Sequence, residues 1–316
     1  MSNAAQSKRR WNQFSLKTLL ITMVVLVLGC GWLGSVAREA NRQRRVVDEL
    51  EQLGAEITFQ LTSVPLPDVF DVKVLERISE IRFTDPLQSD PYISTREVEA
   101  HLLARENAVT VRDATAFRGM KNLKVLDLSG MPVESVTGLA ELENLEYLTL
   151  SYTKVDDLTA LRKLDSLTQL NLAGTEIADA DLVHLRGMRS LENLSLDDTK
   201  ITDAGMDHIA NLKSLQYLSF YDTKLGNAGL ERLEVLTNLR GLSLYNTQVD
   251  DAGMEHLDSL IQLEWIILID TSVSDAGLEH LRGLTNLEVL SLRGTNVTVD
   301  GVKKLQQALP NCQIVR

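Results

Sequence analysis

Apolar and polar positions recur along the second half of the chain in a nine-residue phrase, Leu-x-x-Leu-x-Leu-x-x-Thr, of which Leu191–Thr199 is one copy. Its first leucine returns after 22 or 24 residues, at Leu123, Leu145, Leu167, Leu191, Leu215, Leu239, Leu263 and Leu287. A fixed period in this range is typical of solenoids, in which each unit packs only against its neighbours. The pattern therefore predicts an extended binding surface rather than one compact core around a catalytic pocket.

Each phrase predicts one short strand, because its leucines alternate with residues that face outward. We expect each strand to pair in parallel with the same strand of the next repeat, while the leucines fill a continuous core. A threonine closes most copies, and its hydroxyl is placed to bond to the backbone of the turn. These threonines are Thr153, Thr175, Thr199, Thr223, Thr247, Thr271 and Thr295, with Met131 in the first copy.

The back halves of the repeats differ in length. In the 24-residue copies, such as Ile201–Leu212, the apolar spacing predicts a helix with Asp203 at its N-cap. The equivalent positions in the other copies are Asp179, Asn227, Asp251 and Asp275. The 22-residue copies lack two residues here, so tighter 3₁₀ turns are expected. Helices wider than strands curve the array and place the parallel sheet on the concave side.

Before the clear repeats, residues 55–110 are interpreted as an N-terminal cap that contains a split first repeat. Its strand half is Leu75–Phe83, and its back half, Val111–Met120, follows an insertion near residues 84–110. The repeats then occupy residues 111–309, and residues 310–316 are predicted to form a C-terminal cap strand. Such caps are expected, because an uncovered terminal repeat would expose its apolar core.

An apolar segment near the N-terminus predicts a transmembrane helix. Thr18–Ala37 are 20 consecutive uncharged residues, long enough to cross a hydrocarbon core of about 30 Å. We expect residues 1–17 to form a basic cytoplasmic tail, residues 38–54 a helical stalk, and the repeats to be exported. Two alternatives remain open: a cleaved signal peptide, and a lipoprotein in which Cys30 is lipidated after cleavage.

Charge divides the chain into two parts. Residues 1–45 hold eight basic side chains and one acidic one, so the rest carries −19 of a total net charge of −12. An acidic body should repel DNA and RNA, which excludes nucleic acid as the expected partner. The two cysteines, Cys30 and Cys312, lie far apart and predict no disulfide framework.

The repeated phrase resembles that of the leucine-rich repeat family, over residues 111–316. Copies with Ile-Thr-Asp-Ala-Gly-Met, as at 201–206, are similar to the ribonuclease-inhibitor-like class, and the 22-residue copies resemble internalin repeats. The opening, Arg9–Leu20, resembles the anchors of bacterial membrane-bound leucine-rich repeat proteins. The resemblance implies an α/β solenoid with a protein-binding concave face.

The outward strand and turn positions hold five of the six tyrosines and the one tryptophan outside the anchor region. Because tyrosine and tryptophan are favoured at binding hot spots, these positions predict a site for a protein with basic and apolar groups. The candidate residues are Tyr147, Tyr152, Asp197, Asp198, Tyr217, Tyr221, Asp222, Tyr245, Asn246, Trp265, Ile267, Ile269 and Asp270. The alternative is that these aromatic side chains only cover neighbouring strands.

No catalytic motif appears, and neither an enzymatic activity nor a cofactor is expected. Four histidines share one repeat position (His184, His208, His256 and His280), but equivalent positions in stacked units are too far apart to share a zinc ion. We therefore predict a membrane-anchored binding protein of the cell envelope. The alternatives are a structural component that self-associates and a lipoprotein adhesin or receptor.

Overall fold

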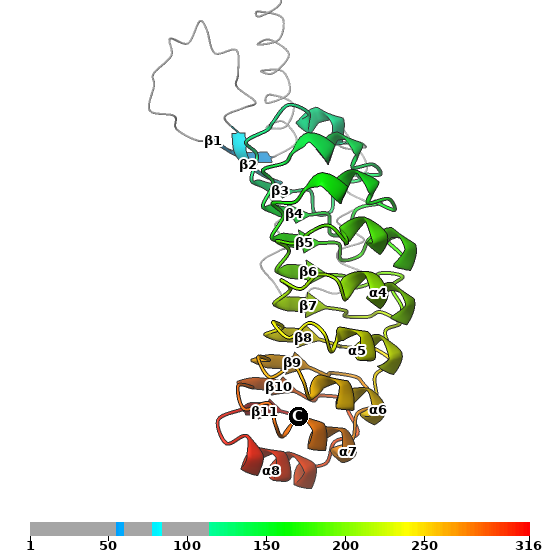
Figure 1. The fold of residues 1–316 in the computed structure, drawn as a ribbon, viewed down its shortest axis with the longest axis vertical. Helices are drawn as coiled ribbons and strands as arrows, with labels where there is room; N and C mark the ends of the chain where they lie inside the picture. Colours follow the sequence, from blue (N-terminus) through cyan, green and yellow to red (C-terminus); the bar gives the residue numbers. More distant parts are fainter. Residues whose placement is uncertain (1–54, 60–77, 84–113) are drawn as a thin grey trace, which may run out of the picture.

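A computed structural model describes residues 55–59, 78–83 and 114–316. Its strands form one sheet in strict chain order, from β1 to β11 (Figure 1). The strands are β1 Ala55–Phe59, β2 Ile78–Phe83, β3 Val125–Asp127, β4 Tyr147–Thr149, β5 Gln169–Asn171, β6 Asn193–Ser195, β7 Tyr217–Ser219, β8 Gly241–Ser243, β9 Trp265–Ile267, β10 Val289–Ser291 and β11 Gln313–Val315. All neighbours pair in parallel except β1 and β2, which are antiparallel.

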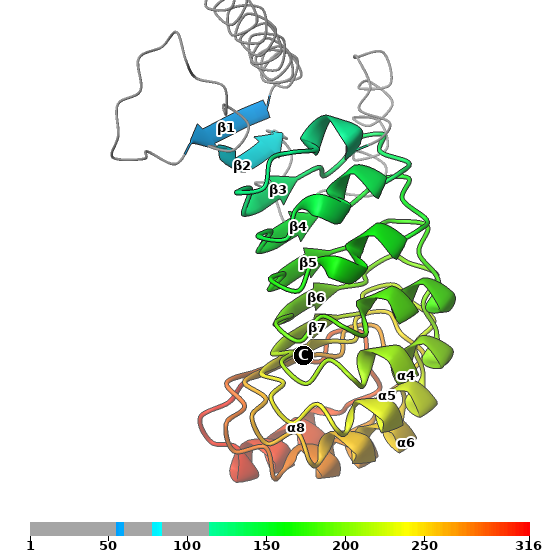
Figure 2. The ribbon, with the colours of Figure 1, turned by 45° about the horizontal axis from the view of Figure 1, so that its top comes forward.

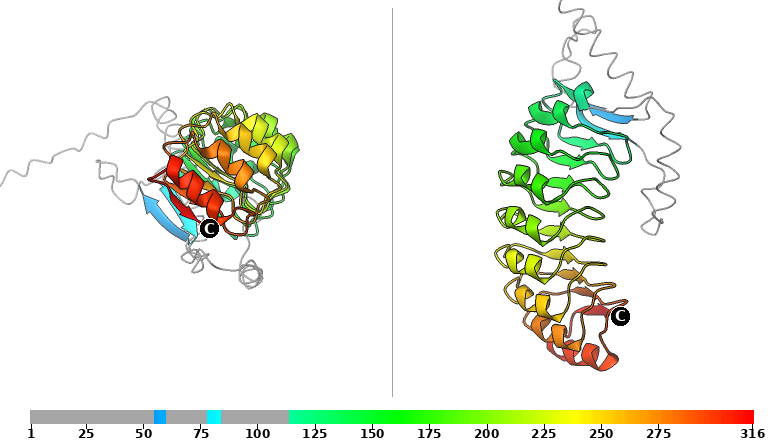
Figure 3. Two further views of the ribbon diagram at one scale, coloured as in Figure 1. Left: turned by 90° about the horizontal axis from the view of Figure 1, so that it is seen from below. Right: turned by 90° about the vertical axis from the view of Figure 1, so that its right-hand side faces the viewer.

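Short helices lie on the face opposite the strands (Figure 2). The 3₁₀ segments are η2 Ala114–Phe117, η3 Thr137–Glu141, η4 Thr159–Lys163, η5 Asp179–Leu185, η6 Asp203–Gly205, η7 Glu255–Leu257 and η8 Glu279–Leu281. The α-helices are α4 Met206–Ile209, α5 Asn227–Leu233, α6 Asp251–Met254, α7 Asp275–Leu278 and α8 Val299–Ala308. The array curves with its strands on the inner side (Figure 3), which confirms the predicted solenoid with a concave parallel sheet.

The shorter repeats have 3₁₀ segments on the side opposite the strands, as predicted. The 22-residue repeats carry only the 3₁₀ segments η3 and η4. Most 24-residue repeats contain an α-helical turn, but one does not, because η5 is 3₁₀ throughout. The helical prediction was therefore wrong for that copy, which is the first long repeat after the two short ones.

The leucines of the phrase form the core. Leu191 and Leu196 are fully buried and Leu194 is 2% exposed, and the other copies repeat this pattern. The closing threonine behaves as predicted: the Thr199 hydroxyl donates to the carbonyl of Leu196 at 2.5 Å. Each of the other six threonines donates to the carbonyl three residues before it in the same way.

The predicted N-cap assignment was wrong by one residue. Thr202 is the N-cap, and its hydroxyl accepts from the Ala204 N–H at 3.3 Å, so Asp203 is the first residue inside the helix. From there the Asp203 carboxylate reaches the next repeat and accepts from the Gly226 N–H at 2.6 Å. This acid therefore joins two repeats instead of capping its own helix, because the first helical turn faces the following loop.

The same bond between repeats recurs in the other long copies, from Asp179, Asn227, Asp251 and Asp275. It explains the Asp-Ala-Gly motif of the long repeats. The glycine lies beneath the preceding repeat's acid or amide; at Gly277, for example, an added Cβ would lie 2.6 Å from Asp251 Oδ1. The Asp-Ala-Gly motif thus reflects a contact between two repeats, in which the glycine of one leaves room for the acid or amide of the one before it.

The ends of the array are also described in part. β2 pairs with β3 in the register of the repeat, with Ile81 opposite Leu126, and β11 lies within the segment 310–316 for which a last strand was predicted. Within the described ranges, no helix combines the length and apolar character that crossing a bilayer requires. The predicted span Thr18–Ala37, with its flanking tail and stalk and the lipidation candidate Cys30, lies outside those ranges.

Candidate functional site

The structure divides the predicted site residues between two places. Four lie on the strands of the concave sheet: Tyr147, Tyr217, Trp265 and Ile267. The other nine lie in the turns that follow the strands, along one edge of the array: Tyr152, Asp197, Asp198, Tyr221, Asp222, Tyr245, Asn246, Ile269 and Asp270. The single patch expected from the sequence is therefore two neighbouring surfaces, which we call the sheet row and the turn edge.

Backbone conformation accounts for several turn-edge residues. The residue just before the last position of the phrase, which is threonine in seven copies and Met131 in the first, has positive φ in all eight repeats, as Asp198 does at 50°. The others are Gly130, Tyr152, Gly174, Asp222, Asn246, Asp270 and Gly294. Glycine, asparagine and aspartate tolerate this left-handed region better than other residues do. Most of the acids and amides at this position therefore have a conformational reason to be there, whatever they bind.

Tyr152 is the exception in this series. Its φ is 56°, although tyrosine has no short polar side chain to stabilise the left-handed conformation. Its ring lies over Gly174, where any Cβ would overlap the ring. The side chain is 36% exposed, so it remains available to a partner.

A cluster of aromatic rings and carboxylates occupies the middle of the turn edge; we call Tyr152, Asp197, Asp198, Tyr221 and Tyr245 the turn cluster. The rings of Tyr221 and Tyr245 lie 4.6 Å apart between centroids and are tilted by 31°. Both tyrosines are half-buried. Such ring pairs are rigid and present a large contact area at low entropic cost.

Asp197 holds the turn cluster to the sheet. Its carboxylate accepts from the Ser219 hydroxyl at 2.5 Å, the Tyr221 N–H at 2.7 Å and the Ser195 hydroxyl at 3.0 Å. Burial raises the pKa of this carboxyl, while these three hydrogen bonds act in the opposite direction. Asp197 therefore orients Tyr221 more than it offers a charge to solvent.

The remaining charges make this edge acidic. Burial, followed by the nearby Tyr245 and Asp222, raises the pKa of the Tyr221 phenol. Burial and then Asp198 and Asp197 raise the pKa of Tyr152, so both phenols stay protonated and can donate hydrogen bonds at neutral pH. Asp198 and Asp222 are exposed beside them.

The sheet row contains a second aromatic pair. The rings of Tyr217 and Trp265 are stacked, with centroids 6.1 Å apart and planes 14° apart. Their strands are not adjacent: β8 lies between them and contributes Gly241, where any Cβ would overlap the indole. The missing side chain lets the indole lean across β8 toward Tyr217. Ile267 is half-buried, as is Ile269 of the turn edge.

Sequence reasoning missed two members of this surface. Gln169 and Asn193 lie between Tyr147 and Tyr217 in the sheet and line a groove of about 240 Å³ on the concave side. The available signal was two outward amides on consecutive repeats, flanked on each side by a tyrosine. It was overlooked because neither residue type stands out by itself.

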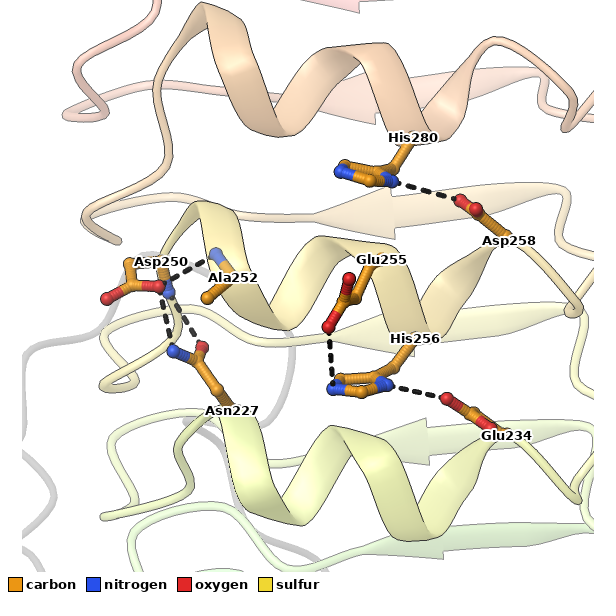
Figure 4. Close-up of polar contacts among 8 residues, drawn as sticks. All are labelled: Asn227, Glu234, Asp250, Ala252, Glu255, His256, Asp258 and His280. Atoms are coloured by element: carbon orange, nitrogen blue, oxygen red, sulfur yellow. Dashed lines mark hydrogen bonds and ion pairs between the residues drawn. The ribbon is translucent and has the colours of Figure 1, made fainter.

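Two of the four repeated histidines, His256 and His280, contact carboxylates on the helical side (Figure 4). His256 Nδ1 lies 2.5 Å from Glu234 and its Nε2 lies 3.7 Å from Glu255, while His280 pairs with Asp258 at 3.5 Å. Figure 4 also shows Asn227 bonded to Asp250 across a repeat boundary. Among the residues described, no three ligand-type side chains are grouped closely enough to hold a metal ion.

Two family models match the chain. A "leucine-rich repeat region" model covers residues 109–255, and a second leucine-rich repeat model covers residues 283–305. Apart from residues 109 and 110, both ranges lie within residues 111–309, where the leucine spacing predicts the repeats. A search of curated proteins gave no significant match.

Solved structures with similar folds include two internalins from Listeria monocytogenes. The first is 26% identical with a TM-score of 0.57, over 66% of this chain and 58% of the internalin. The second, internalin C2, is 28% identical with a TM-score of 0.51, over 64% of this chain and 84% of the internalin. A mouse RP105/MD-1 complex (20% identity, TM-score 0.53, covering 65% and 36%) shares the fold alone. The chain thus spans little more than half of the first internalin.

Proposed function

Because this chain belongs to the leucine-rich repeat family, with internalin-like repeats, we propose that it is a non-catalytic protein that binds a second protein. The family generally mediates protein–protein interaction. We further propose that Thr18–Ala37 anchors the protein in a membrane, that the repeats are exported into the cell envelope, and that the partner binds at the turn edge.

The turn cluster carries this proposal. It presents paired rings, phenol donors and exposed carboxylates together on an outer edge of the array. Aromatic anchors surrounded by polar groups are the usual composition of binding hot spots. The exposed acids Asp198, Asp222 and Asp270 favour a partner with basic groups. The rings favour a partner that also buries apolar side chains.

Crosslinking in intact cells tests the binding proposal. We expect the full-length chain to crosslink to a discrete second protein, and the double variant Tyr221→Ala, Tyr245→Ala to lose most of that product. Ile261→Ala serves as the control, because Ile261 is 54% exposed but is not part of the turn edge. Equal crosslinking by all three chains would contradict the proposed site, and crosslinks only between copies of the chain would favour the structural alternative.

The anchor is proposed on sequence grounds, from the length and charge-free character of Thr18–Ala37 and its basic flanks. Protease treatment of whole cells should remove the repeats if they are exported to the cell surface, and leave the N-terminal tail. The mass of the mature N-terminus separates an uncleaved anchor from a lipoprotein that begins at Cys30. Full protection from protease in intact cells, with cleavage only after lysis, would contradict export to the cell surface.

A further inference from the structure

The groove in the concave sheet is distinct from the turn edge. It has a volume of about 240 Å³ and is lined by residues of β4 to β7 and by Trp265 of β9. Although the body of the protein is strongly acidic, none of the residues that line the groove carries a charge. A ligand that fits it is therefore uncharged over the length in contact.

Register places the main groove residues in one line across the strands. Tyr147 is opposite Gln169, Gln169 is opposite Asn193, and Asn193 is opposite Tyr217. Neighbouring strands lie about 4.8 Å apart, so the two tyrosines are separated by roughly 14 Å with two amides side by side between them. An elongated ligand lying across the strands would meet an aromatic ring at each end and amides in the middle.

Among the described residues, the two amide side chains form no hydrogen bonds that would hold the fold together. Neither Gln169 nor Asn193 makes a side-chain hydrogen bond to any residue in the described part of the chain. Other amides do: Asn171 Oδ1 accepts from the Ala173 N–H at 2.9 Å, and Asn238 Nδ2 donates to the Lys213 carbonyl at 2.8 Å. Two neighbouring amides, each offering two donors and one acceptor, are therefore available to a ligand.

One wall of the groove is rigid. The Trp265 indole packs over Gly241 and against Tyr217, so its position is fixed by contacts on both sides. The face of an aromatic ring carries partial negative charge and attracts polarised C–H groups. Tyr147 forms the opposite wall.

We propose that this groove binds a short, neutral oligosaccharide. Sugar hydroxyls both donate and accept hydrogen bonds, which matches primary amides, and the C–H faces of sugar rings match aromatic walls. A peptide fits less well, because β5 and β6 are each paired on both sides and offer no free edge for strand addition. The groove also has no charged group to hold a charged side chain. This site is independent of the proposed protein-binding edge.

The test is a panel of neutral and acidic oligosaccharides, screened against the folded full-length chain by saturation-transfer NMR. Affinities are then measured by titration for the wild type and for Gln169→Ala, Asn193→Ala and the double variant. We expect neutral saccharides to bind, with about a tenfold loss for each amide removed, because a hydrogen bond of ordinary strength corresponds to about that factor. Gly241→Ala should also weaken binding by displacing the indole.

Two controls keep the result specific. Gln262→Ala removes an exposed amide outside the groove and should leave saccharide affinity unchanged. The double variant Tyr221→Ala, Tyr245→Ala should keep saccharide binding even if it loses a protein partner, which separates failure of this proposal from failure of the protein-binding one.

Three outcomes would overturn the proposal. The first is that no neutral saccharide binds the folded wild-type chain. The second is that saccharides bind equally well to the wild type and the double amide variant. The third is that peptides, and no saccharides, bind in a manner that requires Gln169 and Asn193.

Discussion

Replacing Asn227 with alanine should weaken the junction between two repeats. Asn227 Nδ2 donates to Asp250 Oδ1 at 2.7 Å, and its Oδ1 accepts from the Asp250 N–H at 3.1 Å. One of these hydrogen bonds involves a charged group, worth about 1.5–3 kcal/mol, and the other is neutral, worth about 1 kcal/mol. Because the site is only partly buried and water can replace part of each bond, we expect a loss of about 2 kcal/mol in the free energy of unfolding.

Gly253 allows a sharper test of the same contact. A Cβ at this position would overlap Asn227 Oδ1, so Gly253→Ala should displace the amide and lose both hydrogen bonds. Alanine gains about 1 kcal/mol over glycine in helix propensity, which leaves a net cost of about 1 kcal/mol. In the Asn227→Ala background the overlap is gone, and Gly253→Ala should be neutral or stabilising.

The double-mutant cycle should therefore show a coupling of about 2 kcal/mol. Chemical denaturation followed by far-UV circular dichroism gives the free energies, and hydrogen exchange at α6 shows whether the change is local. A repeat array can depart from two-state unfolding, so hydrogen exchange is needed to measure the stability of this junction separately from that of the whole array. Gly283→Ala, in the turn after η8, is a control for the added methyl group alone, since a Cβ added there would have no other group within 4 Å. An equal effect of Gly253→Ala in both backgrounds would show that the added methyl group does not act through Asn227.

Three further predictions concern single residues. Hydrogen bonds from the Thr298 hydroxyl and N–H lower the pKa of Asp275. The ionised Asp275 carboxylate therefore stabilises the fold above the unfolded pKa of about 3.9, and this stabilisation is lost as pH falls through the lower folded pKa. Asp275→Asn should make the free energy of unfolding less dependent on pH in this acidic range. Burial raises the pKa of Cys312 to about 11, so mass spectrometry should detect its alkylation at pH 8 only after denaturation; rapid labelling of the native chain would contradict this. Thr199→Val removes the donor to the Leu196 carbonyl and should cost about 1 kcal/mol in thermal or chemical unfolding; an unchanged midpoint would show that this hydroxyl does not stabilise the turn.

Much of the fold could be predicted because the repeat leaves few alternatives. Leu191, Leu194 and Leu196 can be buried together only on one face of a strand, and the same spacing in each copy requires stacking in parallel. The 22-residue copies lack the two residues that an α-helical turn would need, so their 3₁₀ backs also follow from length.

The candidate site was less predictable, because its chemistry depends on contacts between repeats. The sequence of a single copy predicts Asp203 as the cap of its own helix, whereas its carboxylate bonds to Gly226 of the next copy. The outward positions of one phrase also do not share one surface: Tyr217 lies in the sheet row and Tyr221 in the turn edge.

The solenoid, its period and its buried residues follow from the sequence alone, because they depend on local alternation and on the need to bury leucine. Which side chains meet across neighbouring strands depends instead on how the repeats pack. Gly241 allows Trp265 to reach Tyr217, and Gln169 and Asn193 form a pair only because the strands are in register. A strand's own sequence sets the direction in which a side chain points, but the neighbouring repeat sets the space and the partners that it finds there.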